Sequence, residues 1–221
     1  MSRFPVPAAD AASPFQTEII IRRSRFLTHC AHTPGMEAAR AFVEQIRTRH
    51  ADATHNCWAF VAGPPGHSGQ VGFSDDGEPH GTAGRPMLQV LLHCGVGEIT
   101  MVVTRWFGGV KLGTGGLVRA YSQAVQAGLE NCLVVEKRPG VRLSVDTDYN
   151  SVGKIQYIAA QEGIDTLESR YSDKAEFDFL VPVAVKDCFQ AKITEGTNGR
   201  ARIRTGKELY YGMNRGELIV F

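Results

Sequence analysis

The hydrophobic positions in the first half of the chain fall into runs with two different periods. Runs that alternate with polar residues, or that are rich in β-branched residues, predict strands at residues 17–22, 24–32, 57–62 and 98–106. Runs with a period near 3.6 residues predict helices at residues 36–50, 82–93 and 115–132. Strands and helices together predict an α+β sandwich for this half.

The segments around these elements carry weaker signals. Thr33-Pro34 supplies an N-cap and a first-turn proline for the first helix. Residues 1–14 are rich in Ala and Pro and predict a loose arm. The Gly and Pro density of residues 63–81 predicts a long irregular loop.

The second half has a different order of elements. We predict a boundary at 137–140 (KRPG), because proline pushes Arg138 toward an extended conformation and Gly140 favours a turn. Beyond it the pattern predicts strand 141–147, helix 151–162, strands 165–171 and 176–183, helix 186–195 and strand 200–210. This β-α-β-β-α-β order is the ferredoxin-like pattern. The chain is therefore predicted to hold an N-terminal domain, residues 1–138, and a ferredoxin-like domain, residues 139–221.

Composition narrows the function classes. The 221 residues are 43% hydrophobic, with 24 basic and 23 acidic side chains, so the net charge of +1 will not attract nucleic acid by itself and any such binding needs a local patch. The five cysteines form no CxxC or zinc pattern and fit a reducing compartment. Neither a signal sequence nor a membrane span is evident, and we expect a cytoplasmic protein without membrane contact.

The strongest candidate for chemistry is a glycine-rich turn between a predicted strand and a predicted helix, Gly113-Thr114-Gly115-Gly116. A helix that opens in this way leaves backbone N–H groups unpaired at its positive end, where phosphate or carboxylate binds. Lys111, Arg119 and Arg105 flank the turn. The alternative is a tight turn whose glycines only let helix and strand approach closely.

This turn does not have the pattern of a nucleotide-cofactor site. Thr114 stands where a P-loop has lysine, and Val118 stands where a dinucleotide-binding fingerprint has its third glycine. A parallel βαβ unit with an acidic ribose partner is also not indicated. We expect no nucleotide cofactor, and no other cofactor.

A second glycine turn, residues 81–86 (GTAGRP), opens the helix at 82–93. Its Arg85 has the forked geometry that binds phosphate or carboxylate in bidentate fashion, so two such turns are suited to successive RNA phosphates. Alternatively, Arg85 pairs with Asp75, Asp76 or Glu78 and holds the preceding loop in shape.

The acidic loop itself has an uncertain role. Asp75, Asp76 and Glu78, with His80, allow a metal or acid–base interpretation, but such residues also cap turns and helices, and they lack calcium-loop spacing. Ser74 is not a nucleophile elbow because Asp76 replaces the required glycine. His55 reaches this loop only if the loop folds back. We predict no metal ligand and no catalytic residue.

A third basic candidate lies in the second half. Arg200, Arg202 and Arg204 alternate with Ala201 and Ile203, which places three guanidinium groups on one strand face. Basic sheet faces can follow an RNA backbone, usually with exposed aromatic residues nearby. Charge that protects an edge strand from aggregation is the alternative.

Several short motifs carry a resemblance to a known family. They are residues 24–26 (SRF), 31–33 (AHT), 55–59 (HNCWA), 73–79 (FSDDGEP), 81–86 (GTAGRP) and 106–117 (WFGGVKLGTGGL). Their order over residues 15–138 resembles the YigZ/IMPACT family. The resemblance implies a two-domain cytoplasmic protein whose halves are similar to the last two domains of elongation factor G, the first half to its domain IV. It also implies a link to translation and supplies no catalytic residue.

From these observations we expect a non-enzymatic, translation-linked regulatory protein. It would bind RNA phosphates or a ribosome-associated partner through the glycine turns and basic residues. Two alternatives stay open: a regulator that binds a translation factor through the loop at 63–81 without RNA contact, and a small metal-assisted hydrolase that uses the SDDGEPH segment.

Overall fold

The computed structural model describes residues 3–66, 70–214 and 216–221. Their contacts divide the chain into two compact units, one of residues Phe4–Glu136 and one that contains Lys137–Phe221. Each unit has its own sheet and its own apolar core. The predicted α+β class is confirmed.

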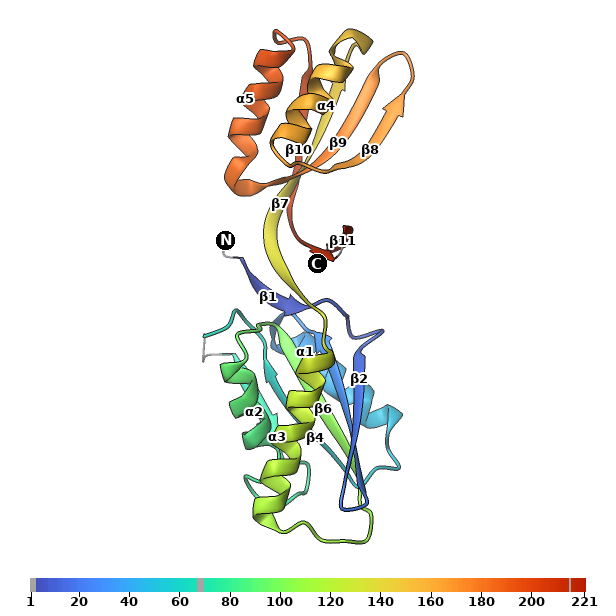
Figure 1. The fold of residues 1–221 in the computed structure, drawn as a ribbon, viewed down its shortest axis with the longest axis vertical. Coiled ribbons are helices and arrows are strands. Elements are labelled where there is room, and N and C mark those ends of the chain that lie inside the picture. Colours follow the sequence, from blue (N-terminus) through green and yellow to red (C-terminus); the bar gives the residue numbers. More distant parts are fainter. Residues whose placement is uncertain (1–2, 67–69, 215) are drawn as a thin grey trace. The chain divides into compact units, whose positions relative to one another are not determined.

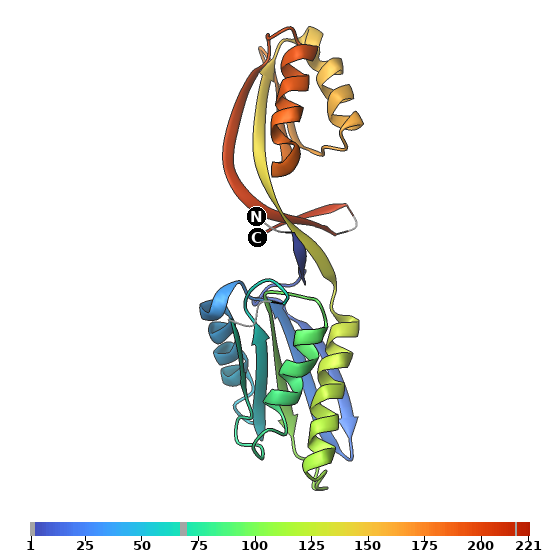
Figure 2. The same ribbon diagram turned by 90° about the vertical axis from the view of Figure 1, so that its left-hand side faces the viewer.

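The first unit has three layers, with a five-stranded antiparallel sheet in the middle. Across the sheet, the strands are β2 (Phe15–Ile21), β3 (Ser24–His32), β6 (Ile99–Trp106), β4 (His55–Val61) and β5 (Val71–Ser74). One face is covered by α1 (Gly35–Arg49), and the other by α2 (Gly84–His93) and α3 (Thr114–Asn131) (Figure 1). Figure 2 shows these layers edge-on, with the blue helix on one side of the strands and the two green helices on the other.

The central strand β6 shows why this sheet needs helices on both faces. Met101 and Val103 point into the core beneath α2 and α3, whereas Val102 packs against Phe42 of α1. A strand that is buried on both faces reads as a continuous apolar run rather than an alternating one. The apolar run that predicts a buried strand at 98–106 therefore has its origin in the three-layer packing.

Three local predictions for the first unit are wrong. The loop predicted at 63–81 contains β5, although its residues 67–69 lie outside the described residues. The arm predicted at 1–14 contains β1 (Phe4–Pro7), whose Phe4 and Val6 are buried, while residues 1 and 2 are outside the described part. Finally, Thr33 does not cap α1, because its hydroxyl is hydrogen-bonded to Thr100 at 2.6 Å and Pro34 is the N-cap residue.

The second unit confirms the predicted β-α-β-β-α-β order. Its elements are β7 (Val134–Thr147), α4 (Val152–Gln161), β8 (Thr166–Tyr171), β9 (Ala175–Pro182), α5 (Lys186–Gly196), β10 (Arg202–Asn214) and an additional β11 (Glu217–Val220). The antiparallel order β11-β10-β7-β9-β8 brings the first and third strands of the motif together in the middle. Both helices pack on one face through a core that includes Ile155, Phe177 and Ile193 (Figure 2).

The segment KRPG does not form the predicted turn. All four of its residues lie inside β7, and Pro139 and Gly140 pair with Tyr210 and Leu209 of β10. A Cβ atom on Gly140 would lie 2.5 Å from Cε1 of Tyr211, so this glycine makes room for an aromatic ring. From the sequence alone, a glycine that makes room for a ring could not be distinguished from a glycine that forms a turn.

Candidate anion-binding site

The N-terminus of α2 is closed by the protein's own carboxylate. Asp75 accepts hydrogen bonds from the backbone N–H groups of Gly81, Ala83 and Gly84, at 2.8, 3.0 and 2.9 Å. Burial opposes the charged form of this carboxylate, but the three backbone donors outweigh it and lower the pKa of Asp75. The predicted anion site at the GTAGRP turn is therefore wrong, because its amides are already satisfied.

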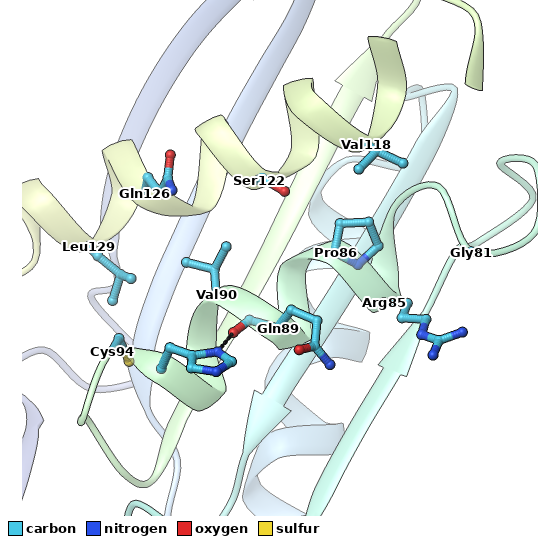
Figure 3. A pocket seen from close by; sticks show the side chains of 11 residues that line it. Gly81, Arg85, Pro86, Gln89, Val90, Cys94, Val118, Ser122, Gln126 and Leu129 are labelled. Atoms are coloured by element: carbon cyan, nitrogen blue, oxygen red, sulfur yellow. Dashed lines mark hydrogen bonds between the residues drawn. The ribbon is translucent and has the colours of Figure 1, made fainter. Parts of the chain in front are cut away.

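Arg85 does not form the internal ion pair that was the alternative to ligand binding. It is exposed, and the described residues include no ion-pair partner for it among Asp75, Asp76 or Glu78. Together with Pro86, Val90 and Leu129 it lines a groove of about 700 Å³. Figure 3 shows this groove between α2 and α3, with the Arg85 guanidinium at one end and Leu129 toward the other.

The N-terminus of α3, in contrast, is open. Gly113 is the N-cap residue at φ 74°, has no side chain to cap with, and accepts the Leu117 N–H through its carbonyl at 2.9 Å. Within the described chain, the N–H groups of Thr114, Gly115 and Gly116 have no acceptor. Thr114 and Gly115 are exposed. Unpaired amides at the positive end of a helix are groups to which an anion can bind.

A cavity of about 390 Å³ lies at this end of α3. Its lining comes from four segments: Thr54 and His55, Glu78 and Pro79, Arg105 and Phe107, and Lys111, Leu112, Gly113, Thr114 and Leu117. Lys111 is exposed, and no acidic side chain of the described chain pairs with it. Arg119, one turn into the helix, is likewise exposed. Of these two cations, Lys111 lines the cavity and Arg119 does not.

Arg105 has a structural role instead of the predicted binding role. Only 5% of its surface is exposed, and its Nη1 lies 2.5 Å from Glu78 Oε1 while Nη2 donates to Ser24 Oγ at 3.3 Å. Its guanidinium carbon also lies over the rings of Phe26 and Phe107, at 5.4 and 5.6 Å from their centroids. The charge is thus used to hold Glu78 in place.

Glu78 is the centre of a buried network below the cavity. The Tyr121 hydroxyl donates to its Oε1 at 2.8 Å, and the Cys57 thiol donates to that hydroxyl at 3.3 Å. Burial raises the pKa of Tyr121 and of Cys57 far above their usual values, so both stay protonated at neutral pH. The network therefore carries one negative charge, on Glu78, balanced by Arg105.

His55 joins this network because the acidic loop folds back over β4. Its Nδ1 lies 2.8 Å from the carbonyl oxygen of Asp76, and its Nε2 lies 3.8 Å from Glu78 Oε2. The sequence indicated such an approach only on the condition that the loop turned back. It placed Glu78 and His55 in different segments and did not show that they share a cavity with Gly113.

The remaining loop residues point in different directions. Asp76 Oδ2 accepts the Asn56 N–H at 2.6 Å, Ser74 Oγ accepts the Asp76 N–H at 3.1 Å, and His80 is fully exposed. Residues 3–66, 70–214 and 216–221 contain no group of three or more His, Cys, Asp or Glu side chains arranged to hold a metal ion. The contacts favour the interpretation of this loop as caps and turns.

The predicted basic stripe in the second unit is a mixed-charge face. Arg204 Nη2 lies 2.8 Å from Asp146 Oδ1, and Arg202 lies opposite Asp146 in the strand register. Arg200 precedes β10 rather than belonging to it, and its Nη1 lies 3.7 Å from Asp148. The neighbouring strands add both signs of charge, through Arg142, Arg170, Glu168, Glu176 and Asp178. Three arginines in alternation thus did not make a basic surface.

Across the described parts of the chain, none of the helices combines the length and the apolar character that crossing a bilayer would require.

Both units match known protein families. Residues 22–129 match the Impact N-terminal domain, and residues 145–200 match a domain of unknown function, DUF1949. The chain is 43% identical over 192 residues to the IMPACT family member YigZ of Escherichia coli, which covers 87% of this chain and 94% of that protein. It is 40% identical over 206 residues to an IMPACT family member of Haemophilus influenzae, covering 92% and 97%.

A solved structure agrees with these relatives. A crystal structure of a hypothetical protein matches with a TM-score of 0.61 and 42% identity, and the match covers 92% of this chain and 97% of that one. The fold thus defines a two-unit α+β protein with an Impact N-terminal domain. The chain belongs to the IMPACT family.

Proposed function

We propose that this protein is a non-enzymatic, translation-linked regulatory protein of the cytoplasm that binds RNA through its backbone phosphates. The phosphate contact lies at the N-terminus of α3, where Lys111 adds a positive charge to the unpaired amides of Thr114, Gly115 and Gly116. The link to translation and the compartment rest on the family resemblance, whereas the phosphate contact rests on geometry.

One observation carries the proposal: α3 begins without any capping group, next to a cavity with cationic residues. A helix N-terminus concentrates about half a positive charge on its free N–H groups. With an unpaired lysine beside them, these groups form a site for a phosphodiester, whose oxygens accept hydrogen bonds from several donors at once.

Filter binding of ribosomal RNA fragments at a series of salt concentrations tests the contact. We expect the logarithm of the affinity to fall linearly with the logarithm of the salt concentration, because phosphate binding releases counterions. Lys111→Ala should lower the affinity and reduce the slope by about 0.7 to 1.

Lys174→Ala is the matched control, because Lys174 is an exposed lysine of the second unit. It should leave both the affinity and the slope unchanged. Undetectable binding at low salt, or a slope that Lys111→Ala does not alter, would contradict the proposal.

A second candidate function follows from the groove between α2 and α3. Its apolar residues Pro86, Val90, Val118 and Leu129, with Arg85 at the end, favour a protein contact of the kind a translation regulator without RNA binding would use (Figure 3). Pull-down from lysate treated with nuclease distinguishes the protein contact from RNA binding. A partner that survives nuclease and is lost in Val90→Glu would favour the protein contact.

A further inference from the structure

A cavity of about 510 Å³ lies in the second unit, and all the residues that line it belong to that unit. In β7, Val141 and Leu143 point into the core beneath the helices. By the alternation of side chains along a strand, Arg138 and Gly140 point to the opposite face. Tyr211 of β10 is the register partner of Arg138 and shares that face. The cavity therefore lies on the face of the sheet that α4 and α5 leave uncovered (Figure 2).

Two buried side chains that rest on Gly140 form part of the cavity wall. Tyr211 and Leu180 are each 5% exposed. A Cβ atom on Gly140 would lie 2.5 Å from Tyr211 Cε1 and 3.2 Å from Leu180 Cδ1, so the glycine lets both side chains pack against the strand. The other apolar residues of the lining are Leu167, Pro182, Met213 and Leu218. A concave, mostly apolar wall with a few polar groups is the usual form of a small-molecule site.

Arg138 brings a positive charge to this cavity without an acceptor for it. Its Nε atom is buried and has no hydrogen-bond partner, and no carboxylate of the described residues forms an ion pair with its guanidinium. The guanidinium carbon lies 5.3 Å from the centroid of the Tyr211 ring. A buried donor without an acceptor is costly, so this one indicates an acceptor from outside the chain. The terminal Nη atoms are not enclosed in this way, and a carboxylate in the cavity can reach them.

Asp165 brings the opposite charge to the same cavity. Its side chain is exposed and forms no ion pair within the part of the chain that the structure describes. Burial raises the pKa of Tyr211, and smaller effects of Arg138 and Asp165 lower and raise it respectively. Both charges therefore lie near one hydroxyl group, yet they do not pair with each other. That hydroxyl has no hydrogen-bond partner among the described residues, so it is a third polar group open to a ligand.

We propose that this cavity binds a small apolar zwitterion, whose carboxylate accepts hydrogen bonds from Arg138 and whose ammonium group pairs with Asp165. An apolar amino acid and a short apolar peptide both have this chemistry, and they differ in the spacing of their two charges. A multiply charged phosphate is disfavoured, because it would add negative charge beside Asp165. The site lies in the second unit and is independent of the RNA contact, so each proposal can fail without the other.

Ligand-observed NMR titrations of the full chain test the proposal with two sets of three probes. One set is L-leucine, leucinamide and N-acetyl-leucine, and the other is leucyl-leucine, its C-terminal amide and its N-acetyl form. We expect the zwitterion of a set to bind at least about 10-fold more tightly than either derivative, because each derivative lacks one charged partner. Binding of leucine supports an amino acid as the ligand, and binding of leucyl-leucine alone supports a peptide.

Two substitutions then locate the two charges of the ligand. Arg138→Gln should weaken the zwitterion by about 10-fold and leave the affinity for the amide, which has no carboxylate, unchanged. Asp165→Asn should weaken the zwitterion and leave the affinity for the N-acetyl form unchanged. An unchanged affinity for the derivative also shows that the variant is folded. Arg40→Gln and Asp173→Asn are the matched controls, because both residues are exposed and lie outside the cavity, and they should change nothing.

Three results would overturn the proposal. Undetectable binding of both zwitterions would mean that solvent alone satisfies Arg138. Equal affinities within a set would mean that the cavity takes only the apolar part of the probe. Binding that neither Arg138→Gln nor Asp165→Asn alters would lie elsewhere on the protein.

Discussion

Two helices on the same face of the first unit begin in glycine-rich turns, yet their N-termini differ in what binds the free amides. At α2, Asp75 lies eight and nine residues before Ala83 and Gly84 and accepts hydrogen bonds from both. The connection from β6 to α3, residues 107–113, contains no acidic residue, and α3 begins uncapped. A glycine turn therefore indicates an anion site only where no acidic side chain of the chain can reach it.

Gly84 in the turn of α2 and Gly115 in the turn of α3 also differ, in the space around them. A Cβ atom on Gly84 would lie 2.6 Å from the Ser74 carbonyl oxygen, because α2 packs directly on β5. A Cβ atom on Gly115 would find its nearest neighbour at 3.8 Å, the flexible Arg119 side chain. Gly84 is required by packing, whereas Gly115 leaves the helix start accessible.

The largest expected effect on stability comes from a substitution that tests this difference in packing. Gly84→Ala should destabilise the first unit by about 3 kcal/mol, because the new methyl group meets backbone atoms that cannot move aside. Gly115→Ala is the matched control and should stabilise by about 0.5 to 1 kcal/mol, since alanine favours the helix. Urea denaturation measures both, and equal effects of the two substitutions would refute the contrast.

Removing the cap of α2 should have the next largest effect. Asp75→Ala leaves three N–H groups without their acceptor and should cost about 2 kcal/mol. Because the opened helix end then resembles that of α3, sulfate should raise the melting temperature of the variant more than that of the wild type. A sulfate response identical to wild type would show that an open amide cluster is not sufficient to bind an anion.

A carboxylate added at the open N-terminus of α3 should stabilise the helix and weaken its binding of RNA. Gly115→Glu places a carboxylate in the first turn of α3, where it interacts favourably with the helix dipole and lies one turn from Arg119. We expect a gain of about 1 kcal/mol in stability together with a loss of about 10-fold in RNA affinity.

Thermal melting and filter binding on the same preparation separate these two effects. Gly115→Ala, which adds no charge, should gain stability and keep its RNA affinity. An unchanged affinity in Gly115→Glu would mean that RNA binds elsewhere.

The smallest expected effect is on the stability of the protein at low pH. The folded-state pKa of Asp75 is lowered, so its stabilising contribution is present above the unfolded pKa of 3.8 and is lost as the pH falls through the folded value. We expect wild-type stability to fall below about pH 4, and Asp75→Ala to lose less over that range. Urea midpoints from pH 5 to 2.5 measure this difference, and parallel curves would assign the acid sensitivity to other groups such as Asp178.

Much of the fold was predictable because it depends on local patterns. The helices at 36–50, 82–93 and 115–132 and the β-α-β-β-α-β order follow from periodicity, and each appears within a few residues of its predicted bounds. The errors lie where packing overrides composition: Phe4 and Val6 form a strand in a Pro-rich start, and KRPG continues β7 because Gly140 accommodates the Tyr211 ring.

The candidate site was predictable only in part. The turn at Gly113–Gly116 and Lys111 were evident from the strand–turn–helix order, which is local information. By contrast, Arg105 and Glu78 are 27 residues apart and form a buried pair. The pairing of Arg204 with Asp146 spans 58 residues. Such neighbours depend on sheet register, which a single sequence does not specify.

The sequence by itself thus determined which segments become helices and strands, the family, and the presence of two helix-opening glycine turns. Only the tertiary structure decided which of those turns is open, because that depends on whether a carboxylate outside the turn folds back onto it. Asp75 does so at α2, and at α3 Glu78 is held away by Arg105 and Tyr121. Local propensity acts over a few residues, whereas the pairing of charges requires the whole sheet to be in place.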